Sequence, residues 1–146
     1  MKITVFGAGN GGLTAAYVLA QNGHDVCIYD SPKFPAQIDA VHEKGGITAL
    51  EEDNGAKMML PGFAKITLAT TDAQKAMEFA DTYMMVCPSF AQEIMFSSML
   101  PYIKNGAKVF VIPGNYGGLV LNKMLQHSDK KGTDVTFIDT ISLPWA

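Results

Sequence analysis

The sequence predicts an α/β fold in which a doubly wound parallel sheet lies between two layers of helices. Short apolar segments alternate with segments of helical period along all 146 residues, which is the pattern of repeated βαβ units. The apolar segments are rich in β-branched residues, as expected for strands that helices cover on both faces. Strands are expected at residues 2–6, 25–29, 66–69, 83–86, 108–112 and 136–139.

Capping residues between these strands predict where the helices begin and end. The first helix is expected from Gly11 to Asn22, because Gly23 favours a helix end. A second helix is expected to begin at Ser31 and Pro32 and to end near Lys44. Two further helix starts carry the capping-box pattern: Thr71 with Gln74, and Ser89 with Gln92. A break is expected near residue 101, a last helix over 117–127, and a hairpin-like insertion over 45–65.

Length and composition describe one globular domain over residues 1–146. The chain is 48% apolar and 17% charged, so it has enough apolar material for a core. A net charge of -3 gives no basic surface for nucleic acid, and no apolar run approaches the roughly 20 residues that span a membrane. A cytoplasmic protein is expected, with Cys27 and Cys87 as reduced core thiols. Whether the chain forms homo-oligomers is left open.

A glycine-rich motif follows the first strand directly and opens the first helix. It reads Gly7-Ala8-Gly9-Asn10-Gly11-Gly12. In this context Gly7 permits a tight turn, Gly9 lets the backbone approach a pyrophosphate, and Gly12 lets the helix pack closely on the strand. The helix N-terminus would supply N–H groups and a positive dipole to the phosphates. The motif predicts a Rossmann-type, three-layer dinucleotide-binding domain; a glycine-rich turn that binds nothing is the alternative.

The second predicted strand ends at Asp30, where this fold places an acidic residue. Its carboxylate would accept hydrogen bonds from the ribose hydroxyls of the adenosine and repel a 2′-phosphate. NAD is therefore the expected cofactor and NADP the less favoured one, although Lys33 could reach a 2′-phosphate.

Four segments carry a resemblance to a known family. They are Gly7-Ala8-Gly9-Asn10-Gly11-Gly12, Val86-Cys87-Pro88, Pro113-Gly114-Asn115-Tyr116-Gly117-Gly118 and Asp139-Thr140-Ile141-Ser142-Leu143-Pro144. In this order they resemble the NAD/NADP octopine and nopaline dehydrogenases, the opine dehydrogenases. The resemblance implies a two-domain oxidoreductase acting on CH–NH bonds, which reductively condenses an α-keto acid with the amino group of an amino acid.

The strand ends and the resemblance together predict the cofactor site. Its expected residues are Gly7, Gly9, Asn10, Gly11, Gly12, Asp30, Cys87, Pro88, Pro113, Gly114, Asn115 and Thr140. The loop over 113–118 would line the nicotinamide, with its glycines allowing close approach. A plain strand-to-helix turn is the alternative for this loop.

The chain departs from the family pattern in two places. The family often carries a histidine near Ala91 and Gln92, and it usually has glutamate where this chain has Asp139. Both departures bear on the substrate more than on the cofactor.

No catalytic set and no metal site is expected within the chain. The histidines have no carboxylate or nucleophile at a sequence spacing typical of a catalytic pair. The resemblance implies that a following helical domain supplies the acid-base residues. The chain alone is therefore expected to be inactive. Two alternatives stay open: a glycerol-3-phosphate dehydrogenase or ketopantoate reductase, and a non-catalytic NAD-sensing regulatory domain.

Overall fold

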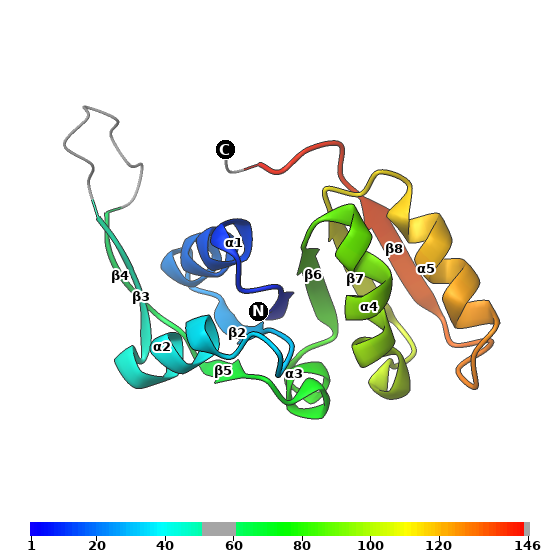
Figure 1. Ribbon diagram of the computed structural model, residues 1–146, viewed down its shortest axis with the longest axis horizontal. Helices are drawn as coiled ribbons and strands as arrows, with labels where there is room; N and C mark the ends of the chain where they lie inside the picture. Colours follow the sequence, from blue (N-terminus) through cyan, green and yellow to red (C-terminus); the bar gives the residue numbers. More distant parts are fainter. Residues whose placement is uncertain (51–60, 145–146) are drawn as a thin grey trace.

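The structure is a computed structural model and describes residues 1–50 and 61–144. Six strands form one parallel sheet: β1 (Lys2–Phe6), β2 (Asp25–Tyr29), β5 (Leu68–Thr70), β6 (Thr82–Val86), β7 (Ala107–Ile112) and β8 (Val135–Asp139). Their order across the sheet is β5-β2-β1-β6-β7-β8. The predicted α/β fold and its parallel sheet are confirmed (Figure 1).

Five helices and one short 3-10 helix lie in the described part of the chain: α1 (Asn10–Gln21), α2 (Ala36–Lys44), α3 (Ala73–Phe79), α4 (Ser89–Met99), η1 (Leu100–Tyr102) and α5 (Gly117–Gln126). An antiparallel hairpin of β3 (Gly46–Ala49) and β4 (Gly62–Lys65) stands beside α1 and α2, apart from the main sheet (Figure 1). It matches the predicted insertion at its two ends, and the middle of that insertion lies outside the described residues.

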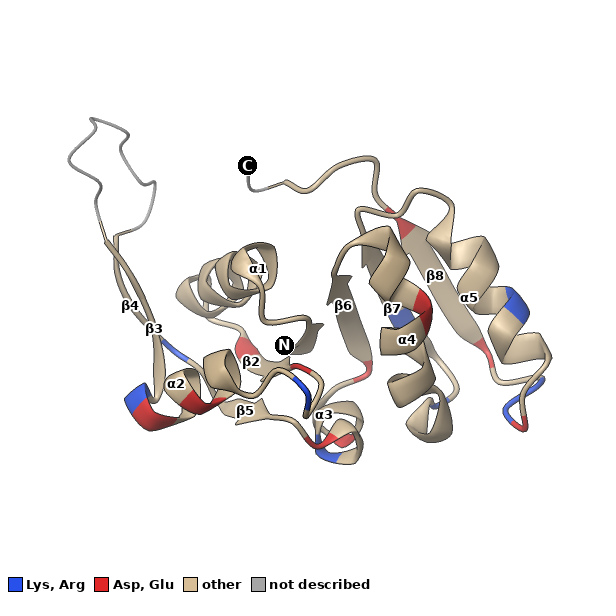
Figure 2. Ribbon diagram, viewed as in Figure 1, with Lys and Arg blue, Asp and Glu red and all other residues tan. Residues whose placement is uncertain are grey.

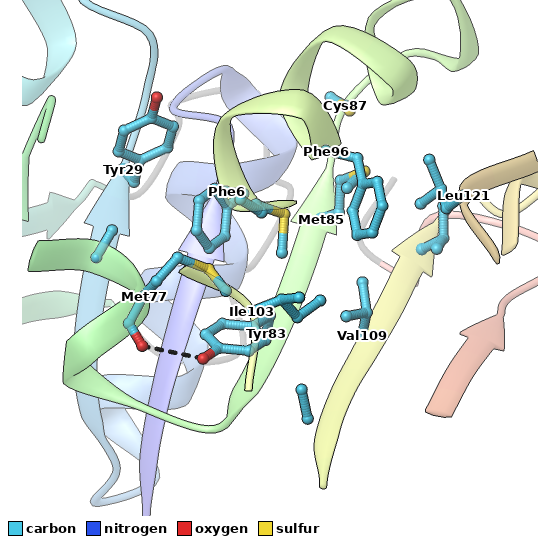
Figure 3. Close-up of a cluster of buried hydrophobic side chains, with 14 of the residues drawn as sticks. Phe6, Tyr29, Met77, Tyr83, Met85, Cys87, Phe96, Ile103, Val109 and Leu121 are labelled. Carbon is cyan, nitrogen blue, oxygen red and sulfur yellow. Dashed lines mark hydrogen bonds between the residues drawn. The ribbon is translucent and has the colours of Figure 1, made fainter. Parts of the chain in front are cut away.

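The sheet has an apolar core on each face, because its strands alternate between the two sides. Val5 and Ile28 pack with α1 and α2 on one face, whereas Phe6 and Tyr29 pack with α3, α4 and α5 on the other. Figure 3 shows the second core, in which the hydroxyl of the fully buried Tyr83 donates to the carbonyl of Met77 at 3.0 Å. Helices covering both faces leave the strand ends as the place for a ligand.

Three predicted helix starts are wrong by one to a few residues. The second helix begins at Ala36 rather than at Ser31, because residues 31–34 form a turn closed by Phe34 N–H on the carbonyl of Ser31. The N-cap of α3 is Asp72, not Thr71, and its carboxylate accepts from Lys75 N–H. Ser89 is the first residue of α4 rather than its cap. The first two boundaries are set by local hydrogen bonds that the predicted pattern does not include, whereas Ser89 Oγ accepts a hydrogen bond from the distant Asn115.

Other expectations agree with the structure. The break at residue 101 is confirmed, since η1 replaces the α-helix there. Cys27 and Cys87 are free and buried. Within the described ranges, the structure contains no helix that is both long and apolar enough to span a bilayer.

Candidate cofactor site

The sheet reverses its winding direction between β1 and β6. β2 and β5 lie on one side of β1, and β6, β7 and β8 lie on the other. In open parallel sheets, ligands bind beyond the carboxyl ends of the strands at such a switch point. Every sequence-predicted site residue lies in a segment that directly follows one of these strands, so the structure brings them all to one edge of the sheet.

The segment over residues 7–12, here called the glycine loop, turns from β1 into α1. Gly7 has a φ of 107°, and a Cβ built on it would overlap the carbonyl of Val86. A Cβ on Gly12 would overlap the carbonyl oxygen of Gly7. These two glycines are therefore required by the fold itself, in the two roles that the sequence predicts for them.

Gly9 differs from Gly7 and Gly12 because a Cβ built on it would meet no atom within 4 Å. Its φ of -71° and ψ of -178° are open to any residue. Gly9 is the N-cap of α1, and no side chain caps the helix there. The first N–H groups of this 12-residue helix are therefore not capped by a side chain, an arrangement that suits a phosphate.

Asp30 ties the end of β2 to the glycine loop. Its Oδ2 accepts a hydrogen bond from Ala8 N–H at 2.7 Å, and its Oδ1 accepts one from Ser31 N–H at 2.7 Å. The residue is half-buried, and each carboxylate oxygen keeps a second lone pair for a ligand. The sequence predicts the ligand role of Asp30, and the structure adds the tie to Ala8.

Residues 113–118, here called the proline loop, turn from β7 into α5. The Ile112–Pro113 peptide bond is cis, and Asn115 and Tyr116 have φ values of 49° and 63°. The loop folds on itself through Gly117 N–H, which donates to the carbonyl of Gly114 at 2.7 Å. It joins the neighbouring segment through Gly114 N–H, which donates to the carbonyl of Thr140 at 2.8 Å.

Side chains from two elements hold the proline loop from opposite sides. On the β8 side, Asp139 Oδ1 accepts from Gly118 N–H at 2.9 Å. On the α4 side, Gln92 Nε2 donates to the carbonyl of Pro113 at 2.8 Å, and Asn115 Nδ2 donates to Ser89 Oγ at 3.0 Å. Ser89 and Gln92 thus serve this loop, not the capping box that the sequence predicts.

The glycines of the proline loop face these same side chains. A Cβ on Gly114 would stand 2.5 Å from Cβ of Asp139, and a Cβ on Gly118 would stand 3.1 Å from its Oδ2. A Cβ on Gly117 would overlap Oε1 of Gln92. Packing within the protein therefore accounts for glycine at all three positions. The sequence predicts instead that these glycines allow a nicotinamide to approach.

Residues 140–144, here called the closing segment, return across the strand ends toward α1 (Figure 1). Thr140 N–H donates to the carbonyl of Val111 at 3.1 Å, and Thr140 Oγ1 lies 3.2 Å from the carbonyl oxygen of Ser142. The side chain of Leu143 lies against Gly11, where a built Cβ would stand 3.2 Å from Leu143 Cδ2 and from Val86 Cγ1. The closing segment thereby brings the end of β8 to the glycine loop.

The two loops that lead into α4 and α5 carry no charged residue of their own, although Asp139 of β8 lies beside the second. Segments 86–92 and 112–120 contain no Asp, Glu or Lys. In Figure 2 the starts of both helices are tan, which is the colour of residues other than Lys, Arg, Asp and Glu. Burial, with a smaller contribution from the charge of Asp30, raises the pKa of the Cys87 thiol to about 12. Cys87 is consequently neutral at physiological pH. Within residues 1–50 and 61–144, no group of three His, Cys, Asp or Glu side chains could hold a metal ion.

Sequence reasoning misses two contributions to this site. The position of Gln92 is visible in the sequence, but its partner Pro113 lies 21 residues away, and no local pattern pairs them. The contact of Leu143 with Gly11 joins the two ends of the chain, so periodicity carries no signal for it.

Comparison with known proteins relates this chain and its fold to dehydrogenases. A family model described as the N-terminus of NAD-dependent glycerol-3-phosphate dehydrogenase matches residues 2–135. A glycerol-3-phosphate dehydrogenase (NAD(P)+) of Staphylococcus aureus strain USA300 is 39% identical over 101 residues, which are 67% of this chain and 27% of that protein. The chain thus spans about a quarter of the length of such relatives.

Two solved structures differ in how fully they cover the chain. Octopine dehydrogenase with NADH and L-arginine aligns over 100% of this chain and 36% of its own, with a TM-score of 0.82 and 25% identity. Glycerol-3-phosphate dehydrogenase from Coxiella burnetii aligns over 93% of this chain and 39% of its own, with a TM-score of 0.63 and 22% identity.

Proposed function

The chain belongs to the family of N-terminal domains of NAD-dependent glycerol-3-phosphate dehydrogenases, and from this premise we propose that it is the cofactor domain of an opine-dehydrogenase-like oxidoreductase. Membership of this family identifies the chain as the NAD-binding domain of a dehydrogenase. One observation carries the finer assignment: octopine dehydrogenase matches the whole chain, including β8 and the closing segment that lie at or beyond the limit of the family match at residue 135.

In the proposed reaction the amine of an amino acid condenses with the carbonyl of an α-keto acid. Water leaves, and the resulting imine takes up a hydride and a proton to become a secondary amine. Bound NADH would supply the hydride. Solved octopine dehydrogenase structures hold L-arginine, agmatine or pyruvate, which makes a keto acid and a cationic amino compound the first substrates to try.

The glycine loop fits the pyrophosphate of NAD. Gly9 leaves open space at the N-terminus of α1, and Asn10, Gly11 and Gly12 begin the helix whose N–H groups would meet the phosphates. Asp30 would accept from the ribose hydroxyls while keeping its bond to Ala8. A 2′-phosphate at this carboxylate would meet like charge, which favours NAD over NADP.

The edge formed by the loops before α4 and α5 would take the nicotinamide half. Its proposed residues are Cys87, Pro88, Pro113, Gly114, Asn115 and Thr140, which follow β6, β7 and β8. This edge offers neutral backbone and side-chain groups to a nearly neutral ring. Asp139 also lies at this edge, but its Oδ1 is bonded to Gly118 N–H.

Acid-base chemistry is proposed to come from a part of the protein outside this chain. Hydride transfer needs the imine carbon held beside the nicotinamide and a proton donor beside its nitrogen. The site described here forms one wall of such an arrangement. A second domain, closing over the strand ends, would form the other wall.

Glycerol-3-phosphate dehydrogenase is the second candidate, because the curated relative that carries this name is 39% identical over 101 residues. One assay separates the two. With the whole protein that carries this chain and the proposed second domain, NADH oxidation is followed by absorbance with pyruvate and a panel of amino acids, and NAD reduction is followed with glycerol 3-phosphate. Turnover that requires both pyruvate and an amino acid supports the opine assignment. Turnover with glycerol 3-phosphate alone would replace it.

A further inference from the structure

Gln92 is a buried polar side chain on α4, with only 4% of its surface exposed. A buried amide costs free energy unless its donors and acceptor are satisfied, so a position of this kind needs a structural or functional reason. The other buried polar side chain among the described residues, Thr4, donates to the carbonyl of Ala76 within the core. Gln92 instead points to the strand ends.

Both ends of the Gln92 amide meet the proline loop. Nε2 donates to the carbonyl of Pro113 at 2.8 Å, and Oε1 occupies the space that a Cβ on Gly117 would take. The bond therefore holds the Pro113 carbonyl toward α4. Gln92 therefore fixes both the first residue of the loop and the first residue of α5.

Gln92 is placed to act on one half of the proposed cofactor site. The proline loop follows β7, whereas the glycine loop and Asp30 follow β1 and β2 across the switch point. No described hydrogen bond joins Gln92 to the glycine loop or to Asp30. A change at residue 92 should consequently move the nicotinamide wall and leave the pyrophosphate and adenosine ribose contacts in place.

We propose that Gln92 is a positioning residue that sets the proline loop as the wall of the nicotinamide pocket, an inference that rests on the proposed NAD-binding function. Asp139 holds the loop from the exposed β8 side and carries a charge. Gln92 holds it from the buried side with a neutral amide, so this contact does not titrate.

Two variants of the protein separate positioning from packing. Gln92→Met keeps a similar length without a donor, and Gln92→Glu keeps the shape but presents a carboxylate to the Pro113 carbonyl. Binding of NADH and of ADP-ribose, which lacks the nicotinamide, is measured by calorimetry. We expect Gln92→Met to weaken NADH binding about tenfold and to leave ADP-ribose binding within about twofold.

The Gln92→Glu variant adds a test by pH. A change in side-chain volume alone would not make NADH affinity depend on pH. An ionised carboxylate repels the Pro113 carbonyl, whereas a protonated one can donate to it. NADH affinity of this variant should therefore recover as the pH falls from about 8 to about 5.5, and ADP-ribose affinity should not. Gln92→Met, measured at the same pH values, is the control for pH effects that do not arise at residue 92.

A measurement on the unmodified protein keeps the inference testable if the variants fail to fold. The side-chain amide signal of Gln92, observed by NMR, should shift when NADH binds and stay in place when ADP-ribose binds. Equal effects on the two ligands, or no effect on either, would overturn the positioning role while NAD binding stands. If the unmodified protein binds neither ligand, the proposed function fails as well.

Discussion

The glycine loop after β1 and the proline loop after β7 both open a helix at the strand ends, yet their glycines face different surroundings. In the proline loop, built Cβ atoms on Gly114, Gly117 and Gly118 would all run into side chains of the protein. In the glycine loop, built Cβ atoms on Gly7 and Gly12 would overlap backbone carbonyl groups, and one on Gly11 would stand 3.2 Å from side chains, whereas Gly9 faces open space. The fold explains every one of these glycines except Gly9.

This difference distinguishes glycines kept for packing from a glycine kept for a ligand. A residue with an ordinary φ and no neighbour could carry a side chain at no cost to the fold. Its being glycine points to something that approaches from outside. The proline loop contains no such position, so its expected role is to present a wall, not to cradle a phosphate.

The largest effect is expected from Gly12→Ala. The added Cβ would overlap the carbonyl oxygen of Gly7, so α1 must move away from β1. We expect a loss of roughly 3 kcal/mol in the free energy of unfolding, measured by urea titration. Gly9→Ser is the matched control, since serine is also a good N-cap, and its unfolding should stay near that of the unmodified chain. Equal losses in the two variants would break the comparison.

Gly9→Val tests the open position directly. The side chain would enter the space proposed for the pyrophosphate without touching the protein. We expect the circular-dichroism spectrum of a folded chain together with an NADH affinity reduced more than about a hundredfold, since the phosphates could no longer reach the helix N-terminus. Affinity equal to that of the unmodified chain would show that the phosphates bind elsewhere.

Asp30→Ala examines the side chain that ties the glycine loop to β2. It removes an acceptor proposed for the ribose hydroxyls and the acceptor of Ala8 N–H. NADH binding should weaken by about 1 to 3 kcal/mol, and the preference against NADPH should disappear. Calorimetric titration with both cofactors measures this. Equal affinity of the unmodified chain for NADH and NADPH would contradict the assignment of Asp30.

Gly117→Ala probes the packed glycines of the proline loop. The methyl group would overlap Oε1 of Gln92, which we expect to cost about 1 to 2 kcal/mol even though alanine favours a helix. In a Gln92→Ala background the same substitution should cost less, because the obstructing side chain is gone. A double-mutant cycle on unfolding free energies measures the coupling. Additive effects would mean that the two residues do not touch.

The smallest effect is expected when the folded chain is treated with a thiol reagent. Burial is the main cause that raises the pKa of Cys27 and of Cys87 to about 12, from an ordinary value of 9.0. In the folded chain at about pH 8, neither should react with an aromatic disulfide reagent, and both should react after unfolding in urea. The unfolded thiols ionise first, so the thiol contribution to stability is constant below pH 9.0 and falls as the pH rises toward 12. Rapid labelling of the folded chain would mean that the thiols are less buried than described.

The sequence predicts the sheet and its glycine loop well because both depend on short-range patterns. The run from β1 through Gly7 and Gly12 into α1 carries its own signals of period, turn and close packing. Ser89 and Gln92 fit a local capping pattern equally well, yet both are bonded to the proline loop more than 20 residues away. Buried polar partners depend on the whole fold, and that is where local rules fail.

The contact between Leu143 and Gly11 has a consequence for the order in which the domain forms. β1 is made first but lies in the middle of the sheet, so the edge that pairs Thr4 with Tyr83 stays unsatisfied until β6 has been synthesised. The closing segment reaches Gly11 later still. Contacts between residues this distant in sequence form slowly, since a long loop must close first. A nascent chain would therefore pair β1 with β6 before Leu143 could reach Gly11 and join the two ends of the domain.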